Sequence, residues 1–126
     1  MFRVIGHATG IELVKRMSSG QVYWPTRGDP SQMTDTIRDQ VNTDKRDIIM
    51  VEFHTVEVNN PESVYNLVDK VQSEQGNVDI LINNAWQYFS PSSDPVEHQR
   101  NVNCTLATNY WGLKTVCKAS LHYWTQ

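Results

Sequence analysis

Long hydrophobic runs are missing from this sequence. No apolar stretch approaches the roughly 18 residues that a membrane-spanning helix requires. The apolar stretch near the N-terminus is also too short for the hydrophobic region of a secretory signal. We therefore expect a soluble, cytoplasmic protein that has no membrane partner.

Cysteine is scarce, and so is any excess of basic charge. The only cysteines are Cys104 and Cys117, which lie on one predicted helix roughly 20 Å apart at 1.5 Å per residue. They are too far apart to form a disulfide with each other, and we expect both to act as small apolar fillers. Eleven Lys and Arg against 14 Asp and Glu give a net charge of −3, which argues against a nucleic-acid partner.

Apolar and helical patterns alternate along all 126 residues, and 39% of the residues are hydrophobic. This content argues against a disordered chain, and the length suits a single domain over residues 1–126. Short β-branched or apolar runs predict strands at residues 2–5, 21–24, within 48–58, and at 78–82. The last run is so uniformly apolar that we expect a strand covered on both faces.

Helices are predicted between these strands from apolar residues that recur every three or four positions. Asp29 and Asn60, each followed by proline, are expected N-caps, and Gly76 is an expected helix end. The expected apolar faces are Ile11, Val14 and Met17; Met33, Ile37 and Val41; Val64, Leu67, Val68 and Val71; and Val102, Leu106, Asn109, Leu113 and Val116.

This alternation predicts an α/β fold, a partial Rossmann-like, doubly wound parallel sheet of about four βα units. Such sheets bind ligands at the carboxyl ends of their strands. Four segments are expected at those ends. They are the turn containing Gly6, Gly10 and Ile11; Arg27; Glu57 with Val58; and residues 83–86, which include Asn83 and Ala85.

Each segment has a functional and a plain interpretation. The glycines could let backbone N–H groups approach a pyrophosphate, or they could form an ordinary turn. Arg27 could hold a 2′-phosphate, and Glu57 could accept from an adenine amino group. The plain interpretation is a solvated surface charge, which is at least as good for Arg27 and is favoured for Glu57 taken alone. Asn109 falls on an apolar helix face, so its amide should have a designated hydrogen-bond partner.

Residues 78–86, together with Asn109, resemble the short-chain dehydrogenase/reductase family, and most of all its carbonyl-reductase-like branch. The family's Asn-Asn-Ala-Gly motif appears as residues 83–86, with Trp86 in place of glycine. The resemblance implies that Glu57 and Val58 match an Asp-Val pair, that Arg27 selects NADP, and that Asn109 positions a water near a catalytic lysine.

The family's glycine motif, Thr-Gly-x-x-x-Gly-x-Gly, is incomplete here in either of two registers. One register uses Gly6 and Gly10 and puts Glu12 at the third glycine. The other makes Gly10 the third glycine and leaves Val4 and Ala8 at the first two positions. We therefore expect weakened binding of NADP(H).

The family places its catalytic Ser on a fifth strand and its Tyr-x-x-x-Lys on the next helix, and we expect both to lie beyond these 126 residues. The one tyrosine with a lysine four positions later is Tyr110, with Lys114, and this pair lies on the predicted helix that carries Asn109. The resemblance thus implies the N-terminal portion of an NADPH-dependent carbonyl reductase that is inactive by itself. A non-catalytic interaction module is the alternative. Without a fifth strand, the run at residues 78–82 would leave an exposed sheet edge through which the chain could self-associate.

Overall fold

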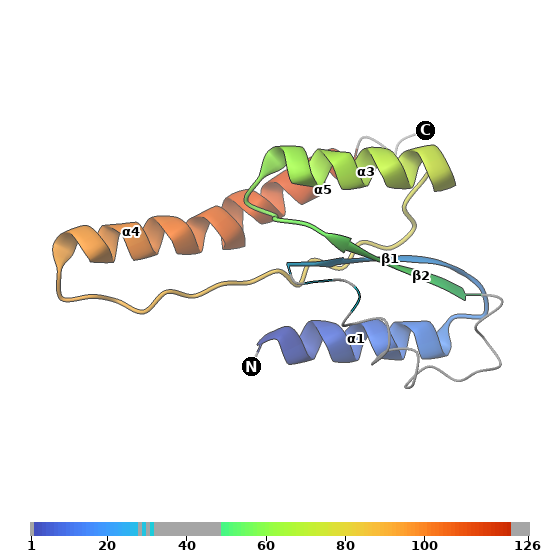
Figure 1. Cartoon of the computed structure of the whole chain (residues 1–126), viewed down its shortest axis with the longest axis horizontal. Helices are drawn as coiled ribbons and strands as arrows, with labels where there is room; N and C mark the ends of the chain where they lie inside the picture. Colours follow the sequence, from blue (N-terminus) through green and yellow to red (C-terminus); the bar gives the residue numbers. More distant parts are fainter. Residues whose placement is uncertain (1, 28, 30, 32–48, 122–126) are drawn as a thin grey trace. The chain divides into compact units, whose positions relative to one another are not determined.

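The computed structural model describes residues 2–27, 29, 31 and 49–121. The chain divides into two compact units, Met1–Val56 and Glu57–Gln126, which are described separately. The first contains helix α1 (Phe2–Arg16) and strands β1 (Gly20–Thr26) and β2 (Ile49–Thr55). The second contains α3 (Pro61–Gln75), α4 (Pro95–Leu106), η2 (Ala107–Gly112) and α5 (Leu113–Leu121) (Figure 1).

In the first unit, β1 and β2 pair in parallel, in a register that runs from Gly20 opposite Ile49 to Thr26 opposite Thr55. Both strands were expected, although β1 continues through Pro25 instead of ending before it. Proline is tolerated in a strand that lies at the edge of a sheet. The α/β class and the parallel sheet are confirmed, with two strands in the described residues where about four βα units were expected.

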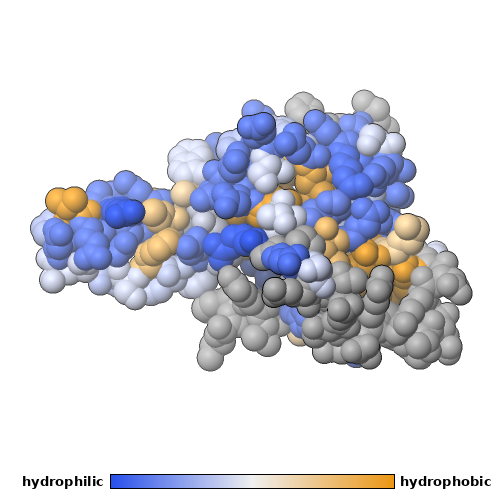
Figure 2. Space-filling view, viewed as in Figure 1, coloured by the Kyte–Doolittle hydropathy of each residue, from blue (hydrophilic) through white to orange (hydrophobic). Residues whose placement is uncertain are grey.

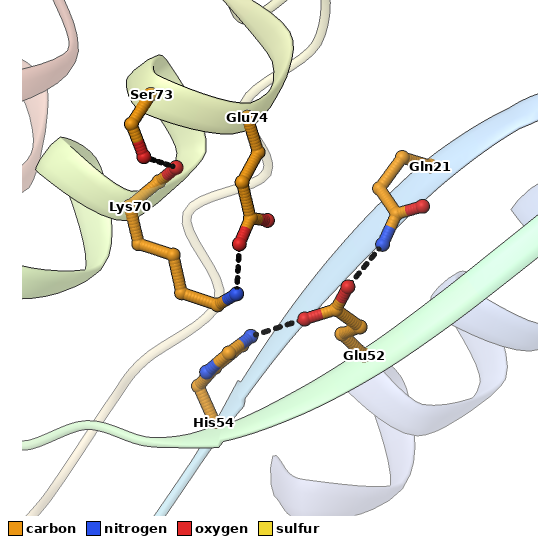
Figure 3. Close-up of polar contacts among 6 residues, drawn as sticks. All are labelled: Gln21, Glu52, His54, Lys70, Ser73 and Glu74. Atoms are coloured by element: carbon orange, nitrogen blue, oxygen red, sulfur yellow. Dashed lines mark hydrogen bonds and ion pairs between the residues drawn. The ribbon is translucent and has the colours of Figure 1, made fainter.

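The two faces of this sheet differ in chemistry. On one face the Trp24 and Phe53 rings lie 5.5 Å apart between centroids. On the other, Gln21 Nε2 donates to Glu52 Oε1 at 2.8 Å, and His54 Nε2 lies 3.3 Å from Glu52 Oε2 (Figure 3). Apolar residues of α1, Ile11 and Val14, are buried as the helical spacing predicted.

The strand expected at residues 2–5 is wrong, because α1 is one helix from Phe2 to Arg16. A short apolar run has no periodicity that separates a strand from a helical turn. Gly6 and Gly10 therefore lie inside a helix and form no turn. The helix predicted from Met33, Ile37 and Val41 lies outside the described residues, although the Ser31 N–H does donate to Asp29 Oδ1 at 2.9 Å, as an N-cap requires.

In the second unit, α3 begins and ends where its sequence signals predicted. Asn60 Oδ1 accepts from the N–H groups of Glu62 and Ser63, and Gly76 adopts φ +80° with its N–H bonded to the Gln72 carbonyl. The apolar face includes the buried residues Val64, Val68 and Val71. On the exposed side, Lys70 pairs with Glu74 one turn later (Figure 3).

The predicted final helix is confirmed as the continuous run α4–η2–α5, but its buried face is not the expected one. Leu106 and Leu113 are 47% and 42% exposed, whereas Thr108, Gly112, Ala119 and Ser120 are buried. Thr108, Gly112 and Ala119 recur at helical spacing, so the buried side is a different face of the run from the one that the leucines predicted. No residue of α4 is buried, and the face of this helix that Figure 2 shows is mostly hydrophilic, with a few apolar side chains.

The strand expected at residues 78–82 is also wrong, since this segment has no regular secondary structure. Ile80 and Ile82 are 66% and 47% exposed, so the segment is not covered on both faces. Within the described residues β1 and β2 pair only with each other. An apolar run becomes a strand only when a neighbouring strand supplies its hydrogen bonds, and the edge that we expected here for self-association is not formed.

Candidate functional site

The side chain of Asn109 makes two hydrogen bonds with the backbone of Gln87, a contact that we call the clamp. Asn109 Oδ1 accepts from the Gln87 N–H at 2.8 Å, and Asn109 Nδ2 donates to the Gln87 carbonyl at 2.7 Å. This is the pairing that a neighbouring strand would provide, supplied by one amide group. The expectation that Asn109 has a designated partner is confirmed.

Two further residues of α4 hold the same extended segment, and neither was predicted from the sequence. Thr105 Oγ1 accepts from the Phe89 N–H at 3.3 Å, and Asn101 Nδ2 donates to the Ser90 carbonyl at 2.8 Å. With Asn109 they form a polar ladder along one side of the helical run, one rung every four residues. The signal was visible in the sequence as Asn, Thr and Asn at four-residue spacing.

The Asn-Asn-Ala-Trp segment leads directly into this ladder. Asn83 Nδ2 lies 3.5 Å from the Cys117 sulfur on α5, while Ala85 is exposed. Trp86 is 43% exposed and stacks on Tyr88, with centroids 6.0 Å apart and ring planes 12° apart. Both cysteines are free thiols.

Val58 contacts the same helical run, and Glu57 contacts α3. The Glu57 N–H donates to Ser63 Oγ at 3.1 Å, at the start of α3. A Cβ built on Gly112 would lie 2.9 Å from the Val58 carbonyl oxygen, so only glycine permits this approach. The second unit therefore places Val58 against η2, which bears Asn109, and Asn83 against α5, while Glu57 contacts α3.

The remaining cofactor candidates lie in the first unit. Arg27 is exposed and directly follows β1, as the strand pattern predicted. Gly6, Gly10 and Ile11 lie within α1, and Ile11 is buried at 6% exposure. Across residues 2–27, 29, 31 and 49–121, no three His, Cys, Asp or Glu side chains are placed to hold a metal ion.

Comparison with protein families matches residues 2–126 to the short chain dehydrogenase family. The chain belongs to this family. Among curated relatives, carbonyl reductase [NADPH] 1 of Mus musculus is 36% identical over 69 residues, which are 55% of this chain and 24% of the relative. The 3-ketodihydrosphingosine reductase of Bacteroides thetaiotaomicron is 37% identical over 68 residues, 54% of this chain and 25% of the relative.

Solved structures place this chain among Rossmann folds. The NADPH-dependent 3-quinuclidinone reductase from Rhodotorula rubra superposes with a TM-score of 0.76 at 20% identity, over 94% of this chain and 42% of the other. At this identity the likeness concerns the fold. The matched segment covers about a quarter of the curated relatives' length.

The cofactor of the family would need a pyrophosphate site, and the glycine segment of this chain does not fit one. A pyrophosphate is bound by backbone N–H groups in a glycine-rich loop at the start of a helix. Here Gly6 and Gly10 lie inside α1, where N–H groups bond to carbonyls of the preceding turn.

In the part of the chain that the structure describes, no helix is long and apolar enough to cross a membrane.

Proposed function

We propose that this chain is the N-terminal portion of a carbonyl-reductase-like oxidoreductase that uses NADP and acts on ketones, aldehydes or quinones. The mouse relative named for this activity supports the proposal. So does the double hydrogen bond between Asn109 and Gln87, because it ties the chain two residues after the Asn-Asn-Ala motif to the helix that bears the family's asparagine. The reducing cytoplasm suits two free thiols.

The 126 residues do not catalyse reduction by themselves in this proposal. Reduction of a carbonyl requires a proton for the developing alkoxide as hydride arrives. In the family a Tyr supplies this proton and a Lys four residues later lowers its pKa, and we place both, with the Ser, downstream of the helix that bears Asn109. Tyr110 and Lys114 have the same spacing but lie on the helical run of Asn109 itself. The contribution of this chain is structural: Asn109 and Thr105 fix the segment at residues 87–89, and Gly112 admits Val58.

Turnover measurements test this proposal. The purified chain is incubated with NADPH and an aldehyde, a ketone or a quinone, and NADPH oxidation is followed by absorbance. We expect no turnover above the rate without protein. A version extended downstream by a segment with Ser and Tyr-x-x-x-Lys should become active only when a complete glycine loop also precedes α1. Robust turnover by the unextended chain would refute the proposal.

Self-association is a second candidate, favoured by the exposed aromatic side chains of η2. Tyr110 and Trp111 are 53% and 56% exposed, and their rings meet edge to face at 4.8 Å. Lys114 Nζ lies 5.1 Å from the centre of the Trp111 ring. Exposed aromatic clusters are typical of interaction surfaces.

Light scattering after size-exclusion chromatography separates the two candidates. A concentration-independent monomer supports the reductase portion alone. A stable oligomer that dissociates in W111A and is unaffected by NADPH supports the interaction module. W86A is a matched control, because Trp86 is similarly exposed, at 43%, but lies outside η2.

A further inference from the structure

Gly10 lies where α1 crosses β1, and nothing larger than glycine fits there. A Cβ built on Gly10 would lie 2.1, 2.4 and 2.6 Å from three atoms of the six-membered ring of Trp24. These distances are far below any carbon–carbon contact that a folded protein tolerates. Gly10 therefore sets how closely the helix can approach the strand.

Trp24 has little freedom to move away from such a Cβ. Its ring lies 5.5 Å from the Phe53 ring on β2 and 5.9 Å from the His7 ring on α1. Trp24 and Phe53 are also direct partners in the register of the sheet. The ring is thus held by the helix on one side and by the neighbouring strand on the other.

We propose that Gly10 is a helix-packing glycine and that α1 holds no dinucleotide pyrophosphate. Of the two possible registers, this selects the one in which Gly10 is the third glycine, whose role is close packing of helix on strand. The other register would put Glu12 at that packing position. Glu12 is exposed and lies 3.6 Å from Lys15 Nζ and 3.5 Å from Arg16 Nε, so it faces away from the sheet.

The selected register places Ala8, and with it the second glycine position, well inside α1. An N–H at that depth in a helix already donates to the carbonyl four residues earlier. Binding a phosphate there would require unwinding the helix and breaking its packing on Trp24. This inference concerns α1 alone and stands or falls separately from the proposed reductase activity.

A matched pair of substitutions tests the packing role. We expect G10A to lower the melting temperature of the chain by at least about 5 °C. G6A, the same change four residues earlier in the same helix, should leave it unchanged or raise it, because alanine favours helix interiors. Equal effects of G6A and G10A would overturn the proposal.

The same substitution made in a W24L variant keeps the test decisive if G10A alone does not fold. In W24L the ring that opposes Gly10 is absent, so adding G10A to W24L should cost less than half of the melting-temperature loss that G10A causes in the unaltered chain. If G10A alone is unfolded, W24L/G10A should still fold. An undiminished loss in the W24L background would show that the ring is not the obstacle, and would contradict the proposal.

Nucleotide binding supplies the other half of the test. Isothermal titration of the chain with NADPH should show no saturable binding that depends on residues 6–10, and NADPH should not slow amide hydrogen exchange at those residues. The proposal fails if NADPH protects these amides, or if G6A and G10A both weaken NADPH binding at unchanged stability. Turnover of an extended chain is not used as a readout, so failure of the reductase proposal would leave this result interpretable.

Discussion

Residues 49–55 and residues 78–82 are similar as sequence and different as structure. Both are short runs in which apolar residues are in the majority. The first is β2, paired over its whole length with β1, and Ile49 is 5% exposed. The second has no strand partner in the described residues, and Ile80 is 66% exposed. The comparison shows that the partner decides whether an apolar run becomes a buried strand.

The largest expected difference comes from replacing one isoleucine by alanine in each of the two runs. I49A should destabilise the protein by about 2–4 kcal/mol, because it removes buried methyl groups and leaves a cavity. I80A should cost less than about 0.5 kcal/mol, because its side chain is already in water. Urea unfolding followed by tryptophan fluorescence measures both. Similar losses would mean that residues 78–82 are packed like a strand.

The next largest effect concerns the hydrogen bonds that hold Gln87, which follows the run at residues 78–82. N109A removes both hydrogen bonds to the Gln87 backbone, and we expect a loss of about 2 kcal/mol in unfolding free energy. N103A is the control, since Asn103 accepts a single exposed hydrogen bond from Gln99 on the same helical run. Hydrogen exchange at Gln87 should accelerate in N109A only; unchanged exchange there would contradict the clamp.

A smaller effect isolates one rung of the polar ladder. Thr105 and Thr115 each donate to the carbonyl four residues earlier, but only Thr105 also accepts from the Phe89 N–H. T105V should therefore cost about 1 kcal/mol, and T115V should be close to neutral. Thermal unfolding of the two variants gives the difference, and identical curves would remove Thr105 from the ladder.

The smallest effect lies just beyond β1. Hydrogen bonds from the Ser31 N–H, and then from its side chain, lower the pKa of Asp29. A lowered pKa means that the charged form is favoured in the folded protein, so its contribution is present above the unfolded pKa and is lost as pH falls through the folded pKa. Carbon-13 NMR titration should show this low pKa and its return toward the ordinary aspartate value in S31P, which lacks the N–H.

Local signals in the sequence were sufficient for some elements. The caps of α3 were predicted at Asn60 and Gly76 because each acts on backbone groups within one turn. The partner of Asn109 was anticipated because an amide on an apolar face must be satisfied. The identity of that partner, Gln87, could not be read from periodicity, since it depends on how a distant extended segment folds back.

Other elements depend on contacts that periodicity does not contain. Residues 2–5 read as a strand because four residues cannot distinguish a period of 2 from a period of 3.6. The prediction of an apolar stripe on the final helix assumed a uniform helix, and it therefore placed Leu106 and Leu113 in the core. Gly10 could be assigned a register only once Trp24 was seen against it.

The π-helical segment η2 lets the two halves of one continuous helix, α4 and α5, direct their side chains to different sides. In an α-helix each residue advances by about 100°, so a uniform helix would fix the direction of α5 once that of α4 was set. The wider turn at Ala107–Gly112 resets this phase. The α4 side can thus aim its amides and hydroxyl at residues 87–90 while α5 buries Ala119 and Ser120. Deleting one residue from η2 would leave both halves helical and turn one of them away from its neighbour.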